Sequence, residues 1–317
     1  MAVHIKQLLL VTVFVILYTK SETQPIIPRP NCPTITMCGS VPIPFPFGTT
    51  KDCSLDNTFL INCNKTSSTS TDDVPFLPQS NQSVLNIDLA AGKLRVAWPV
   101  ASDCYSKNGT QVNQTIQDII MTNFQISTQN KFIAVGCDTV GILIVAEADS
   151  DEKTFATGCV AYCNNHTDIM ANQPCSGIGC CVSSIPQVQM LTRVGYFSSG
   201  GVFYNKSHSE VHEFNPCGYA FLVENGNYSL TRSDLMLKKK EFPVLLDWTV
   251  GNQTCLEAQK NHSNYACKAE KSRCYNSTER SGYLCRCFDG YEGNPYLIDG
   301  CQGIIYFYLF CYNSCSS

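Results

Sequence analysis

Short runs in which apolar and polar residues alternate dominate the chain, and they predict strands rather than helices. Five such runs are bounded by Gly, Asn, Asp or Pro: Ser83–Leu89, Lys93–Val100, Phe132–Val135, Gly141–Ala146 and Tyr219–Val223. Successive side chains of a strand point to opposite faces, so this period of two indicates half-buried sheets. Helical periodicity is weak, and Ser233–Phe242 is the best short candidate for a helix. The pattern therefore predicts a mainly β fold.

Three segments depart from this pattern. Pro25–Pro33 cannot pair as a central strand because proline lacks the N–H group, and the Ser/Thr-rich stretch Thr66–Asp73 is predicted to be a loop. Near the N-terminus, an apolar run from Leu8 to Tyr18 follows a weakly basic lead. This run has the length of a signal-peptide core and is too short to span a bilayer. We expect residues 1–23 to be a signal peptide, with cleavage between Lys20 and Gln24, and the chain to be secreted.

The 20 cysteines of this 317-residue chain strengthen that prediction and change the picture of the fold. Because disulfides persist in oxidising compartments, this number of cysteines indicates an extracellular, disulfide-rich protein. They form an N-terminal group of five, a middle group of seven and a C-terminal group of six, with two left in the tail: Cys32, Cys38, Cys53, Cys63 and Cys104; Cys137, Cys159, Cys163, Cys175, Cys180, Cys181 and Cys217; Cys255, Cys267, Cys274, Cys285, Cys287 and Cys301; Cys311 and Cys315. Because the first two groups are odd in number, at least one bridge should join them.

Glycosylation signals agree with secretion. Ten Asn-x-Ser/Thr sequons occur, at Asn64, Asn81, Asn108, Asn113, Asn165, Asn205, Asn227, Asn252, Asn261 and Asn276. Glycans need surface positions, so these residues are predicted to face solvent. The net charge of −4, with only 15% charged residues, argues against a nucleic-acid partner.

The C-terminal cysteines have the spacing of an EGF-like module. Cys285-Arg-Cys287 is followed by Gly290-Tyr291 and by a sixth cysteine at Cys301. Such a module is too small for a core of its own, so three disulfides take the place of burial. Gly290 would permit the tight turn and Tyr291 would pack on the neighbouring hairpin. By the EGF pattern, the pairs would be Cys255–Cys274, Cys267–Cys285 and Cys287–Cys301.

Several motifs in order resemble the extracellular region of plant wall-associated receptor kinases. They are Cys38-Gly-Ser-Val-Pro-Ile-Pro-Phe-Pro-Phe-Gly48, Asn130-Lys-Phe-Ile-Ala-Val-Gly-Cys137, Cys175-Ser-Gly-Ile-Gly-Cys180-Cys181, Cys217-Gly-Tyr-Ala-Phe-Leu-Val223 and Gly290-Tyr-Glu-Gly-Asn-Pro-Tyr296. The first resembles the opening of the galacturonan-binding, cysteine-rich domain of these receptors, and the last resembles their first EGF-like repeat.

The resemblance implies cysteine-rich β modules followed by one EGF-like module. We expect a galacturonan-binding-like domain at 28–104, a cysteine-rich middle domain at 105–250, an EGF-like module at 251–302 and an atypical tail at 303–317. The chain departs from these receptors after Cys301, where Gln302-Gly303 and a short apolar run stand in place of a calcium-binding EGF repeat. The kinase motifs His-Arg-Asp and Asp-Phe-Gly are not found in the chain. The tail is therefore interpreted as readthrough or a truncated gene model.

The sequence contains a few residues that could belong to an enzyme or metal site. His208-Ser-Glu210-Val-His212 would place three zinc ligands on one strand face, but we interpret it as a solvated polar face. Cys159-x3-Cys163 and Cys180–Cys181 are interpreted as disulfide cysteines because the chain is secreted. No nucleophile elbow or His-Glu-x-x-His motif occurs, although a glycosidase with two distant acids stays open. We expect no enzymatic activity and no cofactor or metal.

Binding of pectin, a galacturonic acid polymer, is the function that the resemblance implies, with oligogalacturonides as partners. Anion recognition favours Lys and Arg, yet residues 25–150 contain seven basic and ten acidic residues. The cations must therefore cluster on one face, or calcium must bridge sugar and protein carboxylates. Lys51, Lys93 and Arg95 are the predicted sugar contacts. Phe45, Phe47 and Trp98 could stack on sugars, but packing beneath the β layers is favoured.

The alternative function is binding of a protein ligand through the EGF-like and cysteine-rich modules. In that case the chain would act as a receptor form or a decoy that pairs with other receptor ectodomains. Either function places the protein outside the cell, in the wall or at the outer face of the plasma membrane, with membrane anchoring only in a longer form.

Overall fold

The computed structural model describes residues 31–65, 72–121, 124–147, 153–170, 173–187, 191–201 and 208–304. The predicted signal peptide, most of the two predicted irregular segments and residues 305–317 of the tail lie outside this part of the chain. Within it, no helix is both long enough and apolar enough to cross a membrane.

The strands are β1 (Ile35–Cys38), β2 (Val41–Pro44), β3 (Asn62–Lys65), β4 (Asp73–Phe76), β5 (Val84–Asp88), β6 (Lys93–Pro99), β7 (Ala101–Tyr105), β8 (Gln111–Thr115), β9 (Gln117–Ile120), β10 (Gln125–Ile126), β11 (Asn130–Val135), β12 (Thr139–Glu147), β13 (Thr154–Ala161), β14 (Cys180–Ser184), β15 (Leu191–Gly200), β16 (Cys217–Glu224), β17 (Glu241–Asp247), β18 (Ser272–Asn276), β19 (Tyr283–Cys287), β20 (Tyr291–Gly293) and β21 (Cys301–Gly303). The helical segments are short: η1 (Asn57–Phe59), η2 (His166–Asp168), η3 (Arg232–Met236) and α2 (Cys255–Gln259).

The mainly β, disulfide-rich fold predicted from the sequence is confirmed, and all five predicted strands are present as β5, β6, β11, β12 and β16. The predicted helix Ser233–Phe242 is wrong beyond its first turn. The helical segment η3 ends at Met236, and Leu237 has an extended ψ of 116°. Leu235, Leu237 and Phe242 are all buried in one cluster that spans η3 and β17, which explains their spacing without a continuous helix.

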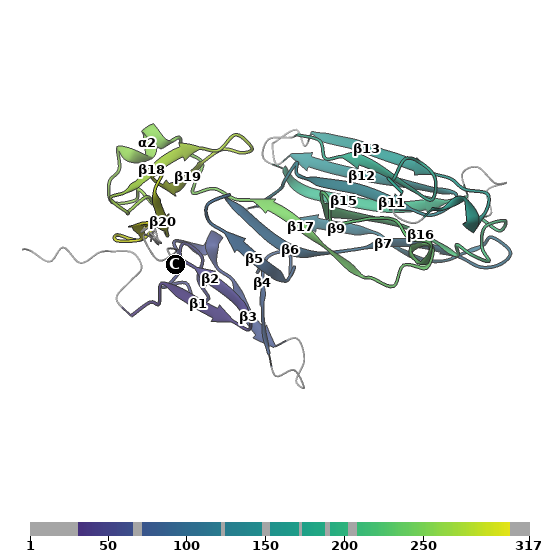
Figure 1. Cartoon of the computed structure of the whole chain (residues 1–317), viewed down its shortest axis with the longest axis horizontal. Coiled ribbons are helices and arrows are strands. Elements are labelled where there is room, and N and C mark those ends of the chain that lie inside the picture. Colours follow the sequence, from purple (N-terminus) through teal and green to yellow (C-terminus); the bar gives the residue numbers. More distant parts are fainter. Residues whose placement is uncertain are drawn as a thin grey trace, which may run out of the picture.

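Two antiparallel sheets form a sandwich (Figure 1). We call β13-β12-β15-β9 the outer sheet and β14-β11-β16-β7-β8 the inner sheet. Their facing side chains share one core, in which Phe132 of the inner sheet meets Tyr196 of the outer sheet edge-on, 6.2 Å between ring centroids. The opposite face of the inner sheet is covered by a second cluster that includes Phe221, Leu230 and Leu235.

A third sheet, the junction sheet, has the order β10-β17-β6-β5 and connects the sandwich to the rest of the molecule (Figure 1). Strand β6 pairs with β17 from Lys93↔Asp247 to Pro99↔Glu241. Leu94, Val96 and Trp98 alternate along β6 and are fully buried. Hydrogen bonding therefore crosses the boundary expected at residue 104, because the N-terminal residues complete their sheet with a strand from the middle segment.

The N-terminal hairpins and the C-terminal hairpins lie together at the end of the molecule away from the sandwich (Figure 1). Trp248 contacts Phe47 and Phe59 edge-on at centroid distances of 5.1 and 5.7 Å, and Tyr296 at 5.9 Å. The side-chain amide of Asn294 donates to the carbonyl of Phe45 at 2.6 Å. The EGF-like module is thus packed on the N-terminal module rather than tethered to it.

Nine disulfides connect the described cysteines: Cys32–Cys53, Cys38–Cys63, Cys104–Cys217, Cys137–Cys163, Cys159–Cys181, Cys175–Cys180, Cys255–Cys274, Cys267–Cys285 and Cys287–Cys301. The prediction that a bridge joins the first two groups is confirmed by Cys104–Cys217, which links β7 to β16. The last three bridges are the pairs that the EGF pattern implied. Gly290 has a φ of +86°, as the tight turn requires, and Tyr291 packs beside Cys287 and Cys301.

Candidate ligand-binding surface

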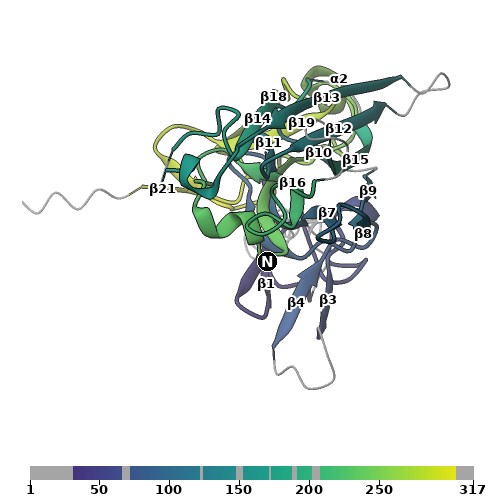
Figure 2. The same cartoon turned by 90° about the vertical axis from the view of Figure 1, so that its right-hand side faces the viewer.

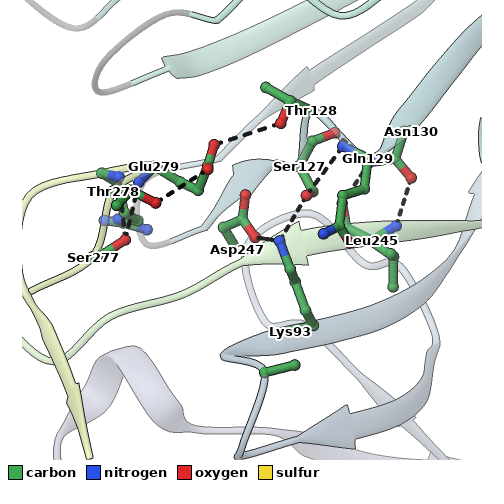
Figure 3. A network of polar contacts seen from close by, with 12 residues as sticks. Lys93, Ser127, Thr128, Gln129, Asn130, Leu245, Asp247, Ser277, Thr278 and Glu279 are labelled. Atoms are coloured by element: carbon green, nitrogen blue, oxygen red, sulfur yellow. Dashed lines mark hydrogen bonds and ion pairs between the residues drawn. The ribbon is translucent and has the colours of Figure 1, made fainter. Parts of the chain in front are cut away.

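Lys93, one of the predicted sugar contacts, lies in a polar network at the junction of the modules (Figure 3). Its ammonium group forms an ion pair with Asp247 of the neighbouring strand β17 and donates to the hydroxyl of Ser127 at 2.8 Å. Both charged side chains are largely buried. Burial raises the pKa of the Asp247 carboxyl, and Lys93 opposes this shift. The charge of Lys93 is therefore compensated inside the protein.

The same network fixes the loop that precedes β11 (Figure 3). The amide of Asn130 donates to the carbonyls of Ser127 and Leu245, both at 2.7 Å, and its oxygen accepts from the backbone N–H of Leu245 at 2.8 Å. Asn130 is fully buried, so these bonds satisfy a group that would otherwise be costly to bury. This part of the network therefore has a structural role, since it holds the loop against β17.

The EGF-like module reaches toward the network through the turn between β18 and β19. The hydroxyl of Thr128 lies 3.5 Å from a carboxylate oxygen of Glu279, and burial lowers the pKa of the neighbouring Arg280 while Asp247 opposes that shift. Lys93, Asp247 and Arg280 thus form a group of charges at the place where three parts of the chain meet.

Arg95 and Lys51, the other predicted contacts, have different environments. The guanidinium of Arg95 makes two hydrogen bonds to the carboxylate of Glu224, at 2.9 and 2.7 Å. Arg95 lies two positions from Lys93 on β6, so the two side chains share one face of the junction sheet. Lys51 is exposed in the turn that follows Gly48. Of the three predicted contacts, Lys51 alone has no carboxylate partner among the described ion pairs.

The aromatic residues considered as sugar platforms are buried. Phe45, Phe47 and Trp98 expose 2%, 1% and 0% of their surface, which confirms that they pack beneath the β layers. Phe47 belongs to the cluster around Trp248. No stacking surface for sugar rings is available from these three residues.

The structure reveals an exposed cationic segment that the sequence analysis treated only as part of a helix. Lys238, Lys239 and Lys240 are consecutive and exposed in the extended connection that leads into β17. None of them takes part in the described ion pairs. The amino group of Lys239 lies 4.4 Å from the ring centroid of Phe242. The three consecutive lysines are the feature of the sequence that could have indicated this cationic segment. The predicted helix Ser233–Phe242 obscured it, because a helix would have pointed the three side chains in different directions.

His208 is the clearest correction to the sequence analysis. The segment after it consists of turns, and His208 is fully buried, so the solvated strand face expected for His208, Glu210 and His212 is wrong. The ring stacks on Tyr105 at 4.7 Å, and its Nε2 lies 2.7 Å from the carbonyl of Asn215. Burial lowers the pKa of His208. Among the described residues, no group of three His, Cys, Asp or Glu side chains is placed to hold a metal ion.

The described sequon residues all face solvent. Asn64, Asn81, Asn108, Asn113, Asn165, Asn227, Asn252, Asn261 and Asn276 are exposed. Asn205 lies outside the described residues. Attachment of glycans at these positions stays a prediction.

Comparisons with known proteins show similarity to wall-associated receptor kinases of plants. Residues 32–98 match the family described as wall-associated receptor kinase galacturonan-binding. The chain is 36% identical over 302 residues to wall-associated receptor kinase 2 of Arabidopsis thaliana, which covers 94% of this chain and 37% of that protein. It is 33% identical over 306 residues to wall-associated receptor kinase 3 of the same plant, covering 93% and 39%. The chain thus spans less than half of the length of these relatives. No solved structure matches it.

Proposed function

We propose that the protein binds galacturonan outside the cell, without catalysis, because residues 32–98 match the family described as wall-associated receptor kinase galacturonan-binding and most of the chain is similar to such receptors. The observation that carries this proposal is the family match, which coincides with the disulfide-stapled hairpins β1 to β4 and with strands β5 and β6. Nine disulfides among the described residues support an extracellular location, where such bridges persist.

Electrostatics narrows the places where an anionic polymer would be held. A carboxylated sugar gains most from cations that have no internal partner, because a paired cation must first give up its own carboxylate. Lys93 and Arg95 are paired with Asp247 and Glu224, respectively. We therefore propose that they shape the face of the junction sheet, and that Lys51 and the three lysines from 238 to 240 supply the uncompensated positive charge.

Calcium is the second part of the proposal. The chain carries a net charge of −4, so a polyanion is repelled at long range unless a divalent cation screens or bridges the carboxylates. Calcium accepts several carboxylate oxygens at once and can link a sugar carboxylate to one from the protein. Binding through calcium bridges should disappear when calcium is chelated, whereas binding through lysines should be weakened mainly by salt.

The test is retention of the secreted, glycosylated chain on immobilised de-esterified pectin, with calcium and with a chelator. We expect retention that falls as salt is raised from about 50 to 300 mM, since the Debye length shortens accordingly. Replacing Lys238, Lys239 and Lys240 by Gln should lower retention about tenfold, given exposed ion pairs of up to about 1 kcal/mol each. The matched control replaces Lys107, Lys153 and Lys260, which are also exposed, by Gln.

Two further variants test the predicted contacts one at a time. Lys51→Gln removes an exposed charge without disturbing a partner. Arg95→Gln should be combined with Glu224→Gln, because removing the cation alone leaves a partly buried carboxylate uncompensated. Absence of retention by the unaltered chain with calcium and with chelator would overturn the proposed function and favour the alternative, a protein ligand.

A further inference from the structure

The outer face of the outer sheet is an apolar surface that no other described part of the chain covers. Direct cross-strand partners lie on the same face, so the register of β12 with β13 and β15 defines it. Its residues are Val140, Ile142, Ile144 and Ala146 of β12, Thr154, Ala156, Gly158 and Val160 of β13, and Arg193, Gly195, Phe197 and Ser199 of β15. Figures 1 and 2 both show β12, β13 and β15 as a layer on the outside of the molecule. We call this the open face.

The open face contrasts with the other large sheet face. Side chains on the far side of the inner sheet, such as Phe221 and Val223, are buried beneath the segment that contains Leu230 and Leu235. On the open face, Ile142, Ile144 and Phe197 are only half-buried, and Val160 is 42% exposed. An antiparallel sheet with one solvated face ordinarily alternates apolar and polar residues. Here β12 carries apolar residues on both faces, which a solvated strand does not require.

A shallow groove of about 300 Å³ marks the edge of the open face where β15 meets β9. Its apolar lining comes from Ile144, Gly195 and Phe197 and from Ile116 in the connection into β9, and the side chains of Asp118 and Arg193 line it as well. Ile120, at the end of β9, is 61% exposed beside Arg193, its cross-strand partner. Apolar side chains therefore lie on all four strands of the sheet, with the exposed Arg193–Asp118 pair between them on β15 and β9, and an exposed apolar patch of this kind is typical of interaction surfaces.

Charge and sequon positions indicate what kind of partner can approach. The charged groups defined by the strand register on this face and β9 are Arg193 and Asp118, which neutralise each other in a two-bond ion pair. None of the ten sequons lies in β9, β12, β13 or β15. A second copy carries the same face, which bears no sequon and whose two charges neutralise each other, so two molecules can meet there despite a net charge of −4 on each chain.

We propose that the protein associates with a second copy of itself through the open face. Around a two-fold axis the interface is self-complementary, with each copy presenting the same patch. The exposed ion pair then lies at the rim, where Asp118 of one protomer can approach Arg193 of its partner and fix the orientation. This proposal does not depend on galacturonan binding, since the open face lies on strands outside residues 32–98.

The dimensions of the face set the expected strength. Seven residues of β12 extend about 20 Å and four strands cover about 19 Å, or about 400 Å² in projection. Standard interfaces bury about 800 Å² on each partner, so the dimer belongs to the weak class. We expect a dissociation constant on the order of 10–100 µM in the isolated protein.

A glycan attached to the open face gives the sharpest test, because a single substitution creates a glycosylation sequon there. Phe197→Asn creates a sequon with Ser199 on the open face. The matched control, Phe197→Asn with Ser199→Ala, has the same side chain at 197 but cannot be glycosylated. Both are produced in a glycosylating host and compared with the unaltered chain by sedimentation velocity from about 1 to 100 µM.

We expect the unaltered chain to shift from monomer toward dimer with concentration, and the glycosylated variant to stay monomeric. The control should retain part of the association. A second pair of variants, Ile144→Glu on the open face and Leu85→Glu on β5, separates the effect of the face from that of added charge. We expect Ile144→Glu to weaken dimer affinity at least tenfold and Leu85→Glu to leave it unchanged. A monomeric unaltered chain at all concentrations, or equal losses for Ile144→Glu and Leu85→Glu, would overturn the proposal, and monomers that bind another protein through this face would replace it.

Discussion

At the scale of single residues, His208 is the side chain whose surroundings have the most direct consequence. It is fully buried beside Tyr105, its Nδ1 lies 4.0 Å from an oxygen of Asp138, and Asp103 and His212 also face it. Burial lowers its pKa most, and His212 acts in the same direction, while the carbonyl of Asn215 and the two carboxylates oppose them. The folded protein therefore holds His208 neutral more strongly than the unfolded chain does.

This environment predicts a loss of stability on mild acidification. The unfolded histidine takes up a proton near pH 6.5, while the folded one resists until lower pH, so stability is full above about pH 6.5 and falls below it. The slope reaches at most about 1.4 kcal/mol per pH unit. His208→Gln should lower stability at pH 7.5 but flatten the change between pH 6.5 and 5.5, as measured by urea unfolding.

The exposed His262 provides the control for this prediction. His262→Gln should leave the slope unchanged. Carboxyl groups with ordinary pKa values titrate mostly below this window, so they contribute little to it. An unchanged slope in His208→Gln would show that other groups set the acid sensitivity.

The residue scale also shows what the sequence alone could not predict. Lys93 and Arg95 are candidates for sugar contacts in the sequence because anion recognition favours Lys and Arg. Their partners, Asp247 and Glu224, are 154 and 129 positions away in the chain. Nothing local signals such a pairing, because it follows from the order of strands in the junction sheet and its approach to β16. Lys51 differs, since it is exposed in a turn and takes part in none of the described ion pairs.

At the scale of elements, the close approach of the β5–β6 turn to strand β19 holds the EGF-like module in place. Gly92 has a φ of +64°, and Leu284 of β19 fills the space where a Cβ would lie. The carbonyl of Ala90 accepts a hydrogen bond from Arg286 at 3.1 Å. The turn and the module are thus fitted to each other, and the missing side chain at Gly92 is required for the fit.

Gly92→Ala should therefore destabilise the molecule more than backbone strain alone. The added Cβ would lie 2.4 Å from Cδ1 of Leu284, which must move. The matched control is Gly226→Ala, which has a φ of +85° and no atom within 4 Å of the new Cβ. We expect the free energy of unfolding to fall by about 1 kcal/mol in the control and by about 2–3 kcal/mol in Gly92→Ala, as measured by chemical unfolding. Equal losses would show that Leu284 yields at no cost.

Strands were predicted better than the helix for a physical reason. A strand buried on one face can be recognised from the alternation of apolar and polar residues over five or six positions, as in β6 with Leu94, Val96 and Trp98. In contrast, the spacing of Leu235, Leu237 and Phe242 is the result of several short segments that converge on one cluster. Residues that fold onto a common core from irregular backbone imitate a helical pattern, so periodicity is informative only where the backbone is regular.

At the scale of the whole molecule, the number of cysteines in each group correctly predicted that a disulfide joins the first two groups. Two odd groups had to share a bridge, and Cys104–Cys217 closes a sequence separation of 113 residues. Which cysteines pair within each group could not be derived in this way, because counting constrains parity and not geometry. The EGF-like group differs, since its short spacings belong to a recurring pattern.

The long bridge should contribute more to stability than the shortest one. In the chain-entropy description, a loop of about 110 residues stabilises by about 4.8 kcal/mol and one of five residues by about 2 kcal/mol. We expect replacement of Cys104 and Cys217 by Ala to cost more than replacement of Cys175 and Cys180, whose separation is 5. Thermal unfolding of the two double variants measures the difference, and the reverse order would contradict this account.

The position of β17 between β6 and β10 has a consequence for how the protein is made. Residues 32–98 emerge early from the ribosome, and β6 can pair with β5 on one edge, but its other edge lacks a partner until Glu241–Asp247 have been synthesised about 140 residues later. At ribosomal speeds of about 5–20 residues per second, this delay is on the order of ten seconds. During that time the edge of β6 is available for wrong pairings. The segment with the galacturonan-binding signature therefore completes its sheet only with a strand from outside it, and we expect a fragment that stops at residue 98 to aggregate rather than fold.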